Sequence, residues 1–192
     1  MKALFDRAVA RTVRAATTLP RYALALALLP LPLAALAQAE NSGCDTYEAP
    51  EQAVIDRFAA PSLPAPAGGE DGAPARLDTG TAYRTTLMPQ ARVRFVAEPG
   101  RHTLADGAYA TTLVFHTEQA GPYRAYIDDA SWVDLVDDNG ERVPSEDFGG
   151  RHDCRALRKF VAYTLESDHD YVLQLSGGTR QRVRVLVQPD RR

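Results

Sequence analysis

The histidines and the acids beside them are the residue types from which a metal site could be built. The chain contains four histidines, His102, His116, His152 and His169. No two of them are two or four residues apart, so no single strand or helix would present two together, and a metal site needs three or four converging ligands. His152 stands next to Asp153, and a metal-binding protein or metal-dependent enzyme centred on His152 is one hypothesis. We favour the alternative, a solvated loop, and predict no cofactor and no metal.

Acidic side chains are a second possible source of metal chemistry, because Ca²⁺ takes six to eight oxygen ligands. They form four groups: Asp128-Asp129, Asp134, Asp137-Asp138 and Glu146-Asp147. Asp and Asn are also frequent in turns, which accounts for the group before Gly140. Asp134 differs, because it lies within an apolar run, where a carboxylate shielded from water is costly unless it is paired. We expect an ion pair between Asp134 and Arg158 or Lys159.

Nucleophilic catalysis has no recognisable motif in this chain. There is no Gly-x-Ser-x-Gly sequence, which would place a serine on a sharp turn between a strand and a helix. Paired carboxylates for glycoside hydrolysis would need a cleft, and no insertion that could form one is visible. We therefore predict no catalytic residue and favour a protein that is not an enzyme.

Aromatic side chains offer a binding chemistry instead, because exposed rings can stack on sugars. Trp132 is the single tryptophan, and together with Tyr126 and loop 144–156 it could bind a carbohydrate or another small ligand. We favour the alternative, in which the aromatic side chains fill a core and Trp132 is buried with Val133 and Leu135 in a central strand. On the binding hypothesis, the candidate residues are Trp132, Asp134, His152, Asp153, Arg158 and Lys159.

Cys44 and Cys154 are the two cysteines of the chain. In an oxidising compartment an even pair predicts a disulfide. A thiol site is the alternative, but neither cysteine lies in a Cys-x-x-Cys motif. A lipid anchor at Cys44 is disfavoured, because Asn41 occupies the position where a lipobox has leucine.

The first 39 residues are typical of an export signal. Five basic residues accompany an uncharged run over 22–37, and Ala37 and Ala39 place small residues at −3 and −1 of a cut before Glu40. The run contains Pro30 and Pro32 and is shorter than the roughly 20 residues that a membrane-spanning helix needs. We expect the segment to be removed, leaving a periplasmic or secreted bacterial protein without a membrane span.

Charge excludes one class of partner. Five of the 22 Lys and Arg residues and one of the 25 acids lie in residues 1–39, so 17 basic and 24 acidic residues remain, and the formal charge moves from −3 to −7. Nucleic-acid binding depends on clustered Lys and Arg. We therefore expect no nucleic-acid partner.

Periodicity divides the remaining chain into three parts. Residues 40–59 contain a short helical pattern, with Pro50 at its start and Val54, Ile55 and Phe58 on one face. Residues 60–80 are rich in Pro, Ala and Gly and are expected to form a flexible linker. Residues 81–192 alternate with a period of two, which predicts an all-β antiparallel sandwich. The expected strands lie at 83–87, 93–97, 109–115, 123–127, 132–136, 159–165, 171–175 and 183–187.

Three segments resemble the pre-peptidase C-terminal type of jelly-roll sandwich. They read A-G-P-Y-R at 120–124, W-V-D-L-V-D at 132–137 followed by Gly140, and Y-V-L-Q-L-S-G at 171–177. The resemblance covers about half of the chain after residue 39. It implies a jelly-roll topology for the sandwich, and the motifs are too short to imply a ligand.

The segment D-C-R-A-L-R-K at 153–159 departs from that family. It is similar to a group of small exported bacterial proteins with an N-terminal cysteine, a short helix, a Pro/Ala linker and one sandwich. Some members carry the label homogentisate dioxygenase. Such an iron enzyme needs a set of His and carboxylate ligands with open positions, so the resemblance implies the architecture and not the activity.

These observations favour an exported β-sandwich module that binds a partner or belongs to the cell envelope. The expected partner is an envelope protein or a glycan, and the sequence leaves the oligomeric state open. The alternatives are a carbohydrate or small-ligand binding domain and a metal-dependent protein centred on His152.

Overall fold

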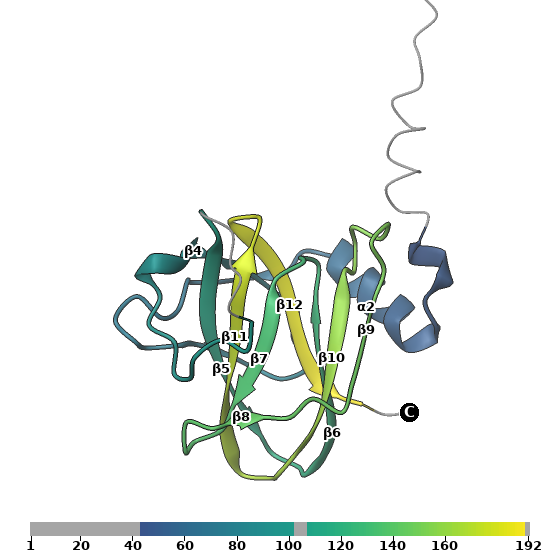
Figure 1. The fold of residues 1–192 in the computed structure, drawn as a ribbon. Helices are drawn as coiled ribbons and strands as arrows, with labels where there is room; N and C mark the ends of the chain where they lie inside the picture. The colour runs from purple at the N-terminus through teal and green to yellow at the C-terminus, as the bar shows by residue number, and fades with distance from the viewer. Residues whose placement is uncertain (1–42, 102–106, 191–192) are drawn as a thin grey trace, which may run out of the picture. The chain divides into compact units, whose positions relative to one another are not determined.

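The computed structural model describes residues 43–101 and 107–190. The expected signal at 1–39 lies outside the described residues, as does His102. The strands of the described chain form two β-sheets that pack face to face (Figure 1). This confirms an all-β sandwich with a short helix, while the jelly-roll connectivity stays a prediction.

The first sheet, sheet A, has the strand order β1-β3-β12-β6-β10-β9. Its neighbours are antiparallel except for β1 and β3, which run parallel. The two edge strands of sheet A are therefore β1 and β9. The strand bounds are β1 Leu63–Ala65, β3 Tyr83–Thr86, β12 Arg182–Pro189, β6 Gly121–Ile127, β10 Lys159–Leu165 and β9 Asp147–Gly150.

The second sheet, sheet B, has the order β2-β5-β11-β7-β8, and β4 also pairs with β5. β2 and β5 run parallel, and the other pairs are antiparallel. The strand bounds are β2 Ala75–Leu77, β5 Tyr109–Thr117, β11 His169–Gly178, β7 Trp132–Val136, β8 Arg142–Val143 and β4 Met88–Pro89.

The main core lies between the two sheets and follows from the alternation of side chains along each strand. Leu173 of β11 and Leu135 of β7 are opposite each other in sheet B and both face inward. Val161 of β10 and Ala125 of β6 do the same in sheet A. Tyr163 also lies in this core, where burial raises the pKa of its hydroxyl.

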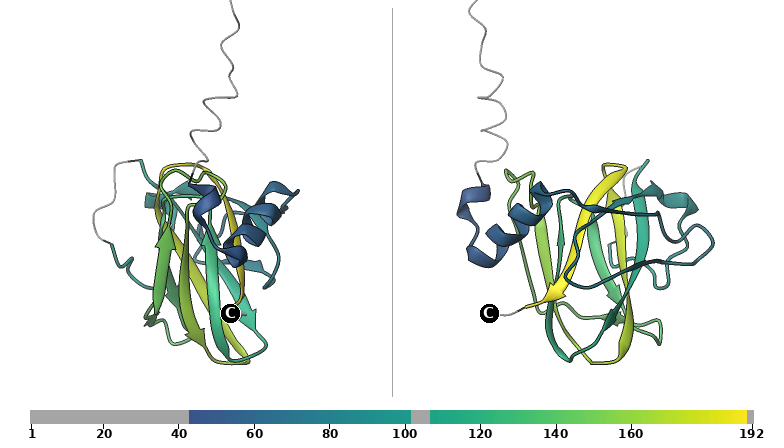
Figure 2. Two further views of the ribbon diagram at one scale, coloured as in Figure 1. Left: turned by 90° about the vertical axis from the view of Figure 1, so that its right-hand side faces the viewer. Right: turned by 180° about the vertical axis from the view of Figure 1, so that it is seen from behind.

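The outer face of sheet A carries a second core beneath the N-terminal helix. Helix α2 (Ala49–Ala59) follows the short 3-10 helix η1 (Cys44–Thr46), and Pro50 lies in its first turn as expected. Val54 and Phe58 of α2 pack with Tyr126 and Leu186 of sheet A. Figures 1 and 2 show α2 beside the strands of this sheet. An isolated helix of this length is marginal in water, so its packing on sheet A holds it in place.

The outer face of sheet B is covered by an irregular segment. After the 3-10 helix η2 (Gln90–Arg92), residues 93–101 form no strand, so the strand expected at 93–97 is wrong. The fully buried Gln174 of β11 holds this segment: its Oε1 accepts from the amides of Val96 and Ala97 at 2.6 and 3.1 Å, and its Nε2 donates to the Ala97 carbonyl at 3.0 Å. A side-chain amide thus replaces a strand partner.

Residues 60–80 are an ordered part of the sandwich, so the expectation of a flexible linker is wrong. β1 pairs with β3 of sheet A, and β2 pairs with β5 of sheet B. Gly68 lies between them so close to β5 that an added Cβ would meet the Thr112 carbonyl oxygen at 2.0 Å. Only glycine permits this approach. The composition that predicted a tether instead allows the chain to cross from one sheet to the other.

Within the described residues, no helix combines the length and apolarity needed to cross a membrane.

Candidate functional site

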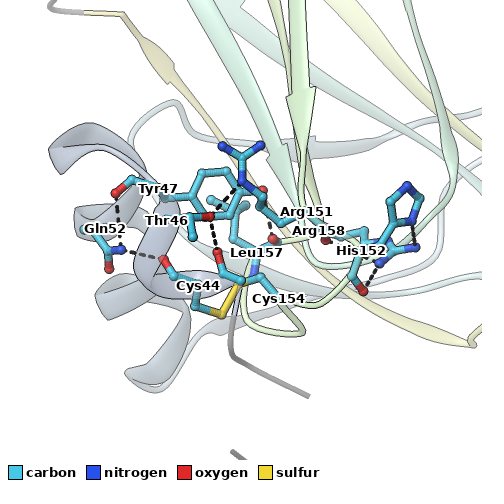
Figure 3. Close-up of a disulfide and its surroundings, with 10 residues drawn as sticks. Cys44, Thr46, Tyr47, Gln52, Arg151, His152, Cys154, Leu157 and Arg158 are labelled. Atoms are coloured by element: carbon cyan, nitrogen blue, oxygen red, sulfur yellow. Dashed lines mark hydrogen bonds between the residues drawn. A yellow bond between two sulfur atoms is a disulfide. The ribbon is translucent and has the colours of Figure 1, made fainter. Parts of the chain in front are cut away.

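The predicted disulfide between Cys44 and Cys154 is present. The two Cα atoms are 4.7 Å apart, and 110 residues separate the cysteines in the sequence. The bond fixes η1 to the loop between β9 and β10, and Figure 3 shows the residues around it. Tyr47 reinforces this contact, because its hydroxyl donates to the Leu157 carbonyl oxygen at 3.1 Å.

A buried arginine holds the other side of the helix, and sequence reasoning missed it. Arg124 of β6 is 4% exposed. It donates to Glu51 of α2 at 2.9 Å and to Asp190 at 2.7 Å, and Asp147 of β9 lies 3.6 Å away. Its guanidinium lies over the ring of Phe160, 4.2 Å from the centroid. The sequence contains one signal of this pair: Arg124 shares a face of its strand with Tyr126, and Glu51 shares a face of its helix with Val54 and Phe58.

Two hollows flank the first turn of α2. One, of about 320 Å³, lies between α2 and the end of β12, and the other, of about 210 Å³, lies between η1 and β9. Tyr126 lines the first, and burial raises the pKa of its hydroxyl. Arg151 lines the second and stacks on Tyr47, 5.1 Å from the ring centroid. The polar groups of both hollows serve mainly to attach α2 to the sheet.

His152 and Arg158 contact each other in the loop after β9 (Figure 3). Arg158 Nη2 lies 2.7 Å from His152 Nδ1, and Arg158 also donates to the carbonyl oxygens of His152 and Arg151. His152 and Asp153 are exposed. Of the six candidate ligand-binding residues, these three lie in one loop.

Neither Lys159 nor Arg158 is paired with Asp134, so the ion pair expected from the sequence is wrong. Asp134 lies on the outer face of sheet B, since its neighbours Val133 and Leu135 face the core. Lys159 is the first residue of β10 in sheet A and is opposite the core residue Ile127 of β6. Its Nζ donates to the Ser131 carbonyl oxygen at 2.6 Å. Sheet B separates the two. Burial lowers the pKa of Lys159.

Trp132 and Asp134 form a small polar site on the outer face of sheet B. The indole N–H donates to Asp134 Oδ1 at 3.0 Å, the amide of Gly100 donates to Oδ2 at 3.0 Å, and Arg142 lies 3.9 Å away. Trp132 is in a strand as predicted, but it is 38% exposed, so its predicted burial is wrong. Tyr126 is buried on the outer face of sheet A, so Trp132 and Tyr126 do not converge.

The corner after β6 contains a second charged cluster that sequence reasoning missed. Asp129 lies 3.1 Å from Arg180, and Asp128 lies 2.7 Å from Arg184. Burial acts to raise the pKa of Asp129, but hydrogen bonds from Ser131 and Arg180 outweigh it and leave the pKa below its ordinary value. Arg184 also donates to the Phe58 carbonyl oxygen, so this corner is joined to the end of α2.

Two other histidines make exposed contacts with acidic side chains at the turn between β10 and β11. His116 Nδ1 is 3.0 Å from Asp170, and His169 is 3.2 Å from Glu166 and 3.4 Å from Asp138. Over residues 43–101 and 107–190, no three His, Cys, Asp or Glu side chains are grouped so that they could hold a metal ion. The His152 hypothesis therefore gains no ligand set among these residues.

The edge strand β9 has the most exposed large apolar side chain of the described chain. Phe148 is 78% exposed, although it is opposite Val161, which faces the core. Gly149 follows it beneath Phe160, whose ring an added Cβ would meet at 2.6 Å. Among the described residues, no further strand pairs with sheet A beyond β9. A strand with one free side and an exposed aromatic ring can accept another strand.

Comparison with protein-family models gives no match for this sequence. Comparison with curated proteins gives no match either. The likeness to pre-peptidase C-terminal sandwiches therefore stays a prediction. The features that bear on function are the β9 edge and the Trp132 site.

Proposed function

We propose that the protein acts outside the cytoplasm, in the periplasm or after secretion, as a non-enzymatic binding module whose partner pairs with the edge strand β9. The observation that carries this proposal is Phe148, which is 78% exposed on an edge strand of sheet A. Strand addition supplies affinity through main-chain hydrogen bonds and specificity through side chains such as this ring.

The surroundings of β9 favour a preformed binding edge. The Cys44–Cys154 disulfide fixes the loop that follows β9, and Asp147 of β9 lies 3.6 Å from the buried Arg124. Both contacts restrict the strand before a partner arrives, and an ordered surface loses less entropy on binding. The disulfide also favours an oxidising compartment.

A photo-crosslinking amino acid at position 148 tests the proposal in cells. Phe148 should give a covalent adduct of defined mass, recovered from the envelope or the medium. Leu63 provides the matched control, because it is 54% exposed on the opposite edge of the same sheet. Its strand contains Pro64, which blunts an edge. Absence of any adduct at 148, or equal adducts at both positions, would contradict the proposal.

The export part of the proposal has its own test. Mass spectrometry of the protein recovered outside the cytoplasm should find Glu40 at the N-terminus, as the Ala37-Gln38-Ala39 sequence predicts. A full-length chain retained in the cytoplasm would contradict export and leave the pairing of β9 as a separate question.

A carbohydrate ligand is a second candidate, favoured by the exposed Trp132 beside Asp134 and Arg142. An indole face with a neighbouring carboxylate and guanidinium can stack on a sugar and bind its hydroxyls. A glycan array tests it with Trp132→Ala as the comparison variant. Binding that the variant abolishes supports this function, and binding that survives in the variant assigns the glycan to another surface.

A further inference from the structure

The free edge of β9 is self-complementary, and this deepens the proposed function, on which the inference rests. We propose that the partner of β9 is a second copy of this chain, with the two β9 strands antiparallel about a twofold axis at Gly149. The proposal follows from which backbone groups face outward, how charges align, and where Phe148 would lie.

The hydrogen-bonding pattern decides which residues can pair. The amide of Arg151 donates to the Arg158 carbonyl oxygen at 3.1 Å, continuing the register in which Gly150 is opposite Lys159. In an antiparallel ladder such pairs alternate. Residues 147, 149 and 151 therefore turn their backbone groups toward β10, and Phe148 and Gly150 turn theirs toward the free edge.

A second β9 must satisfy the same alternation. Outward-facing residues pair only with outward-facing residues, so Phe148 can be opposite Phe148 or Gly150 of the second copy. The second register places Gly149 on the twofold axis. Phe148 then exchanges backbone hydrogen bonds with Gly150 of the second copy, and the twofold axis generates the equivalent pair between Gly150 and Phe148 of the second copy.

Charge selects between these registers. With Gly149 on the axis, Asp147 is opposite Arg151 of the second copy, and the symmetry gives this pair twice. These are non-hydrogen-bonded positions, where side chains approach most closely. With Phe148 on the axis, Asp147 would be opposite a glycine. Asp147 has a side-chain exposure of 59%, and Arg151 is exposed, so both can reach a second copy.

The apolar part of the edge agrees with the same register. Phe148 would be directly opposite Gly150 of the second copy, which has no side chain to clash with the ring. Each ring would then cover a glycine that is exposed in the single copy. Three existing contacts of Arg151 must change: its side chain now donates to the Gly150 carbonyl oxygen at 3.1 Å and to Thr46 Oγ1 at 2.8 Å, and it stacks on the Tyr47 ring. That guanidinium is released toward Asp147 of the second copy.

Sedimentation of the oxidised protein, as recovered from cells, tests the inference. We expect a dimer that dissociates on dilution, since a short edge contact belongs to the weak class of interfaces. Arg151→Asp should weaken it on the order of tenfold or more, because two attractive pairs become repulsive. Asp147→Arg should do the same. Unchanged thermal unfolding at low concentration shows that the Arg151→Asp variant is folded, and Asp147→Arg, which also removes the contact with Arg124, is judged by the mixing experiment.

Mixing the two variants gives the sharpest result. In a pair formed by one Asp147→Arg chain and one Arg151→Asp chain, both cross-strand contacts join opposite charges again, so the mixture should dimerise where each variant alone does not. Phe148→Pro is an independent variant, since it removes an outward-facing amide together with the exposed ring and leaves the charges unchanged, and it should also abolish the dimer.

The outcomes separate this inference from the proposed function. A wild-type protein that stays monomeric at all concentrations, or a dimer indifferent to Arg151→Asp, overturns the inference. If the crosslink at 148 then joins a different protein, binding at β9 stands and the second copy is excluded. If no adduct forms, both fail.

Discussion

The outer faces of the two sheets are covered in different ways. Sheet A is covered by helix α2. A disulfide and the buried ion pair between Arg124 and Glu51 attach this helix to the sheet. Sheet B is covered by the irregular segment 93–101, which the side chains of Gln174 and Asp134 hold through hydrogen bonds to its backbone. Helix α2 is therefore held by a covalent cross-link and a buried ion pair, whereas segment 93–101 is held by hydrogen bonds to individual side chains.

This difference shows what each cover requires. Helix α2 satisfies the backbone groups of its interior and needs an apolar face and a firm attachment. The segment 93–101 cannot satisfy its backbone alone, so polar side chains of sheet B must do it. We therefore expect the free energy of unfolding to depend most on the attachments of α2 and least on the exposed groups over sheet B.

The largest effect is expected at Arg124. Arg124→Met should lower the free energy of unfolding by about 3–5 kcal/mol, because Glu51 and Asp190 would remain shielded without their cation. Chemical denaturation measures this. Arg76→Met is the matched control, since Arg76 pairs with Asp170 in solvent, and it should leave the unfolding midpoint in place. Equal losses in both variants would remove the contrast between buried and exposed pairs.

Removing the disulfide comes next. A Cys44→Ser, Cys154→Ser double variant should lose about 2–4 kcal/mol, since the bridge closes a long loop of the unfolded chain. Denaturation of the wild-type protein with and without a reductant should reproduce the shift, and the double variant should not respond to the reductant. A reductant response in that variant would assign the effect to something other than this bond.

A smaller loss is expected over sheet B. Gln174→Ala should cost about 1–3 kcal/mol, because the amides of Val96 and Ala97 lose their acceptor. Hydrogen exchange should accelerate in residues 93–101 and stay slow in α2. Gln181→Ala, at an exposed glutamine, is the control. Accelerated exchange in α2 would mean that the two covers are coupled.

Asp129 adds a dependence on pH at the corner between the sheets. Its pKa is below the ordinary value of 3.8 in the folded protein, so its contribution is present above that value and is lost as the pH falls through and below it. Asp129→Asn should cost about 1–2 kcal/mol at neutral pH. The difference from wild type should shrink on acidification, and a difference that stays constant would contradict the assignment.

The smallest effect is expected at Trp132. Trp132→Ala should change the free energy of unfolding by less than about 1 kcal/mol, because the ring is half-exposed. Trp132 is the single tryptophan, so acrylamide quenching of native fluorescence reports on it alone and should be strong. Weak quenching together with a large loss of stability would restore the buried position expected from the sequence.

The local periodicity of apolar residues along the sequence predicted most of the fold. Alternation located β5, β6, β7, β10, β11 and β12, and an apolar face located α2. Alternation wrongly predicted a strand at 93–97, because an irregular segment that packs over a sheet can show the same alternation of apolar and polar residues as a strand within it. Composition failed at 60–80 for a related reason: Pro and Gly mark an absence of helix, and they do not exclude short strands in parallel pairs.

The polar contacts were harder to predict because they depend on which face each residue occupies. Asp134 was correctly identified as an acid that needs partners, but its partners came from Trp132, Gly100 and Arg142 on its own face. Arg124 forms ion pairs with Glu51 and Asp190, which lie near opposite ends of the described chain. No spacing in the sequence brings such residues together before the sheets are known.

The N-terminal position of α2 has a consequence for the order of synthesis. Nearly everything that α2 packs against, from Arg124 and Tyr126 to Leu186, is made after it. The helix is too short to persist alone, so it must wait until the last strand is complete. Cys44 likewise precedes its partner by 110 residues and meets no other cysteine of its own chain. The first helical segment of the described chain is therefore the last to take its place, and bond formation marks the end of folding.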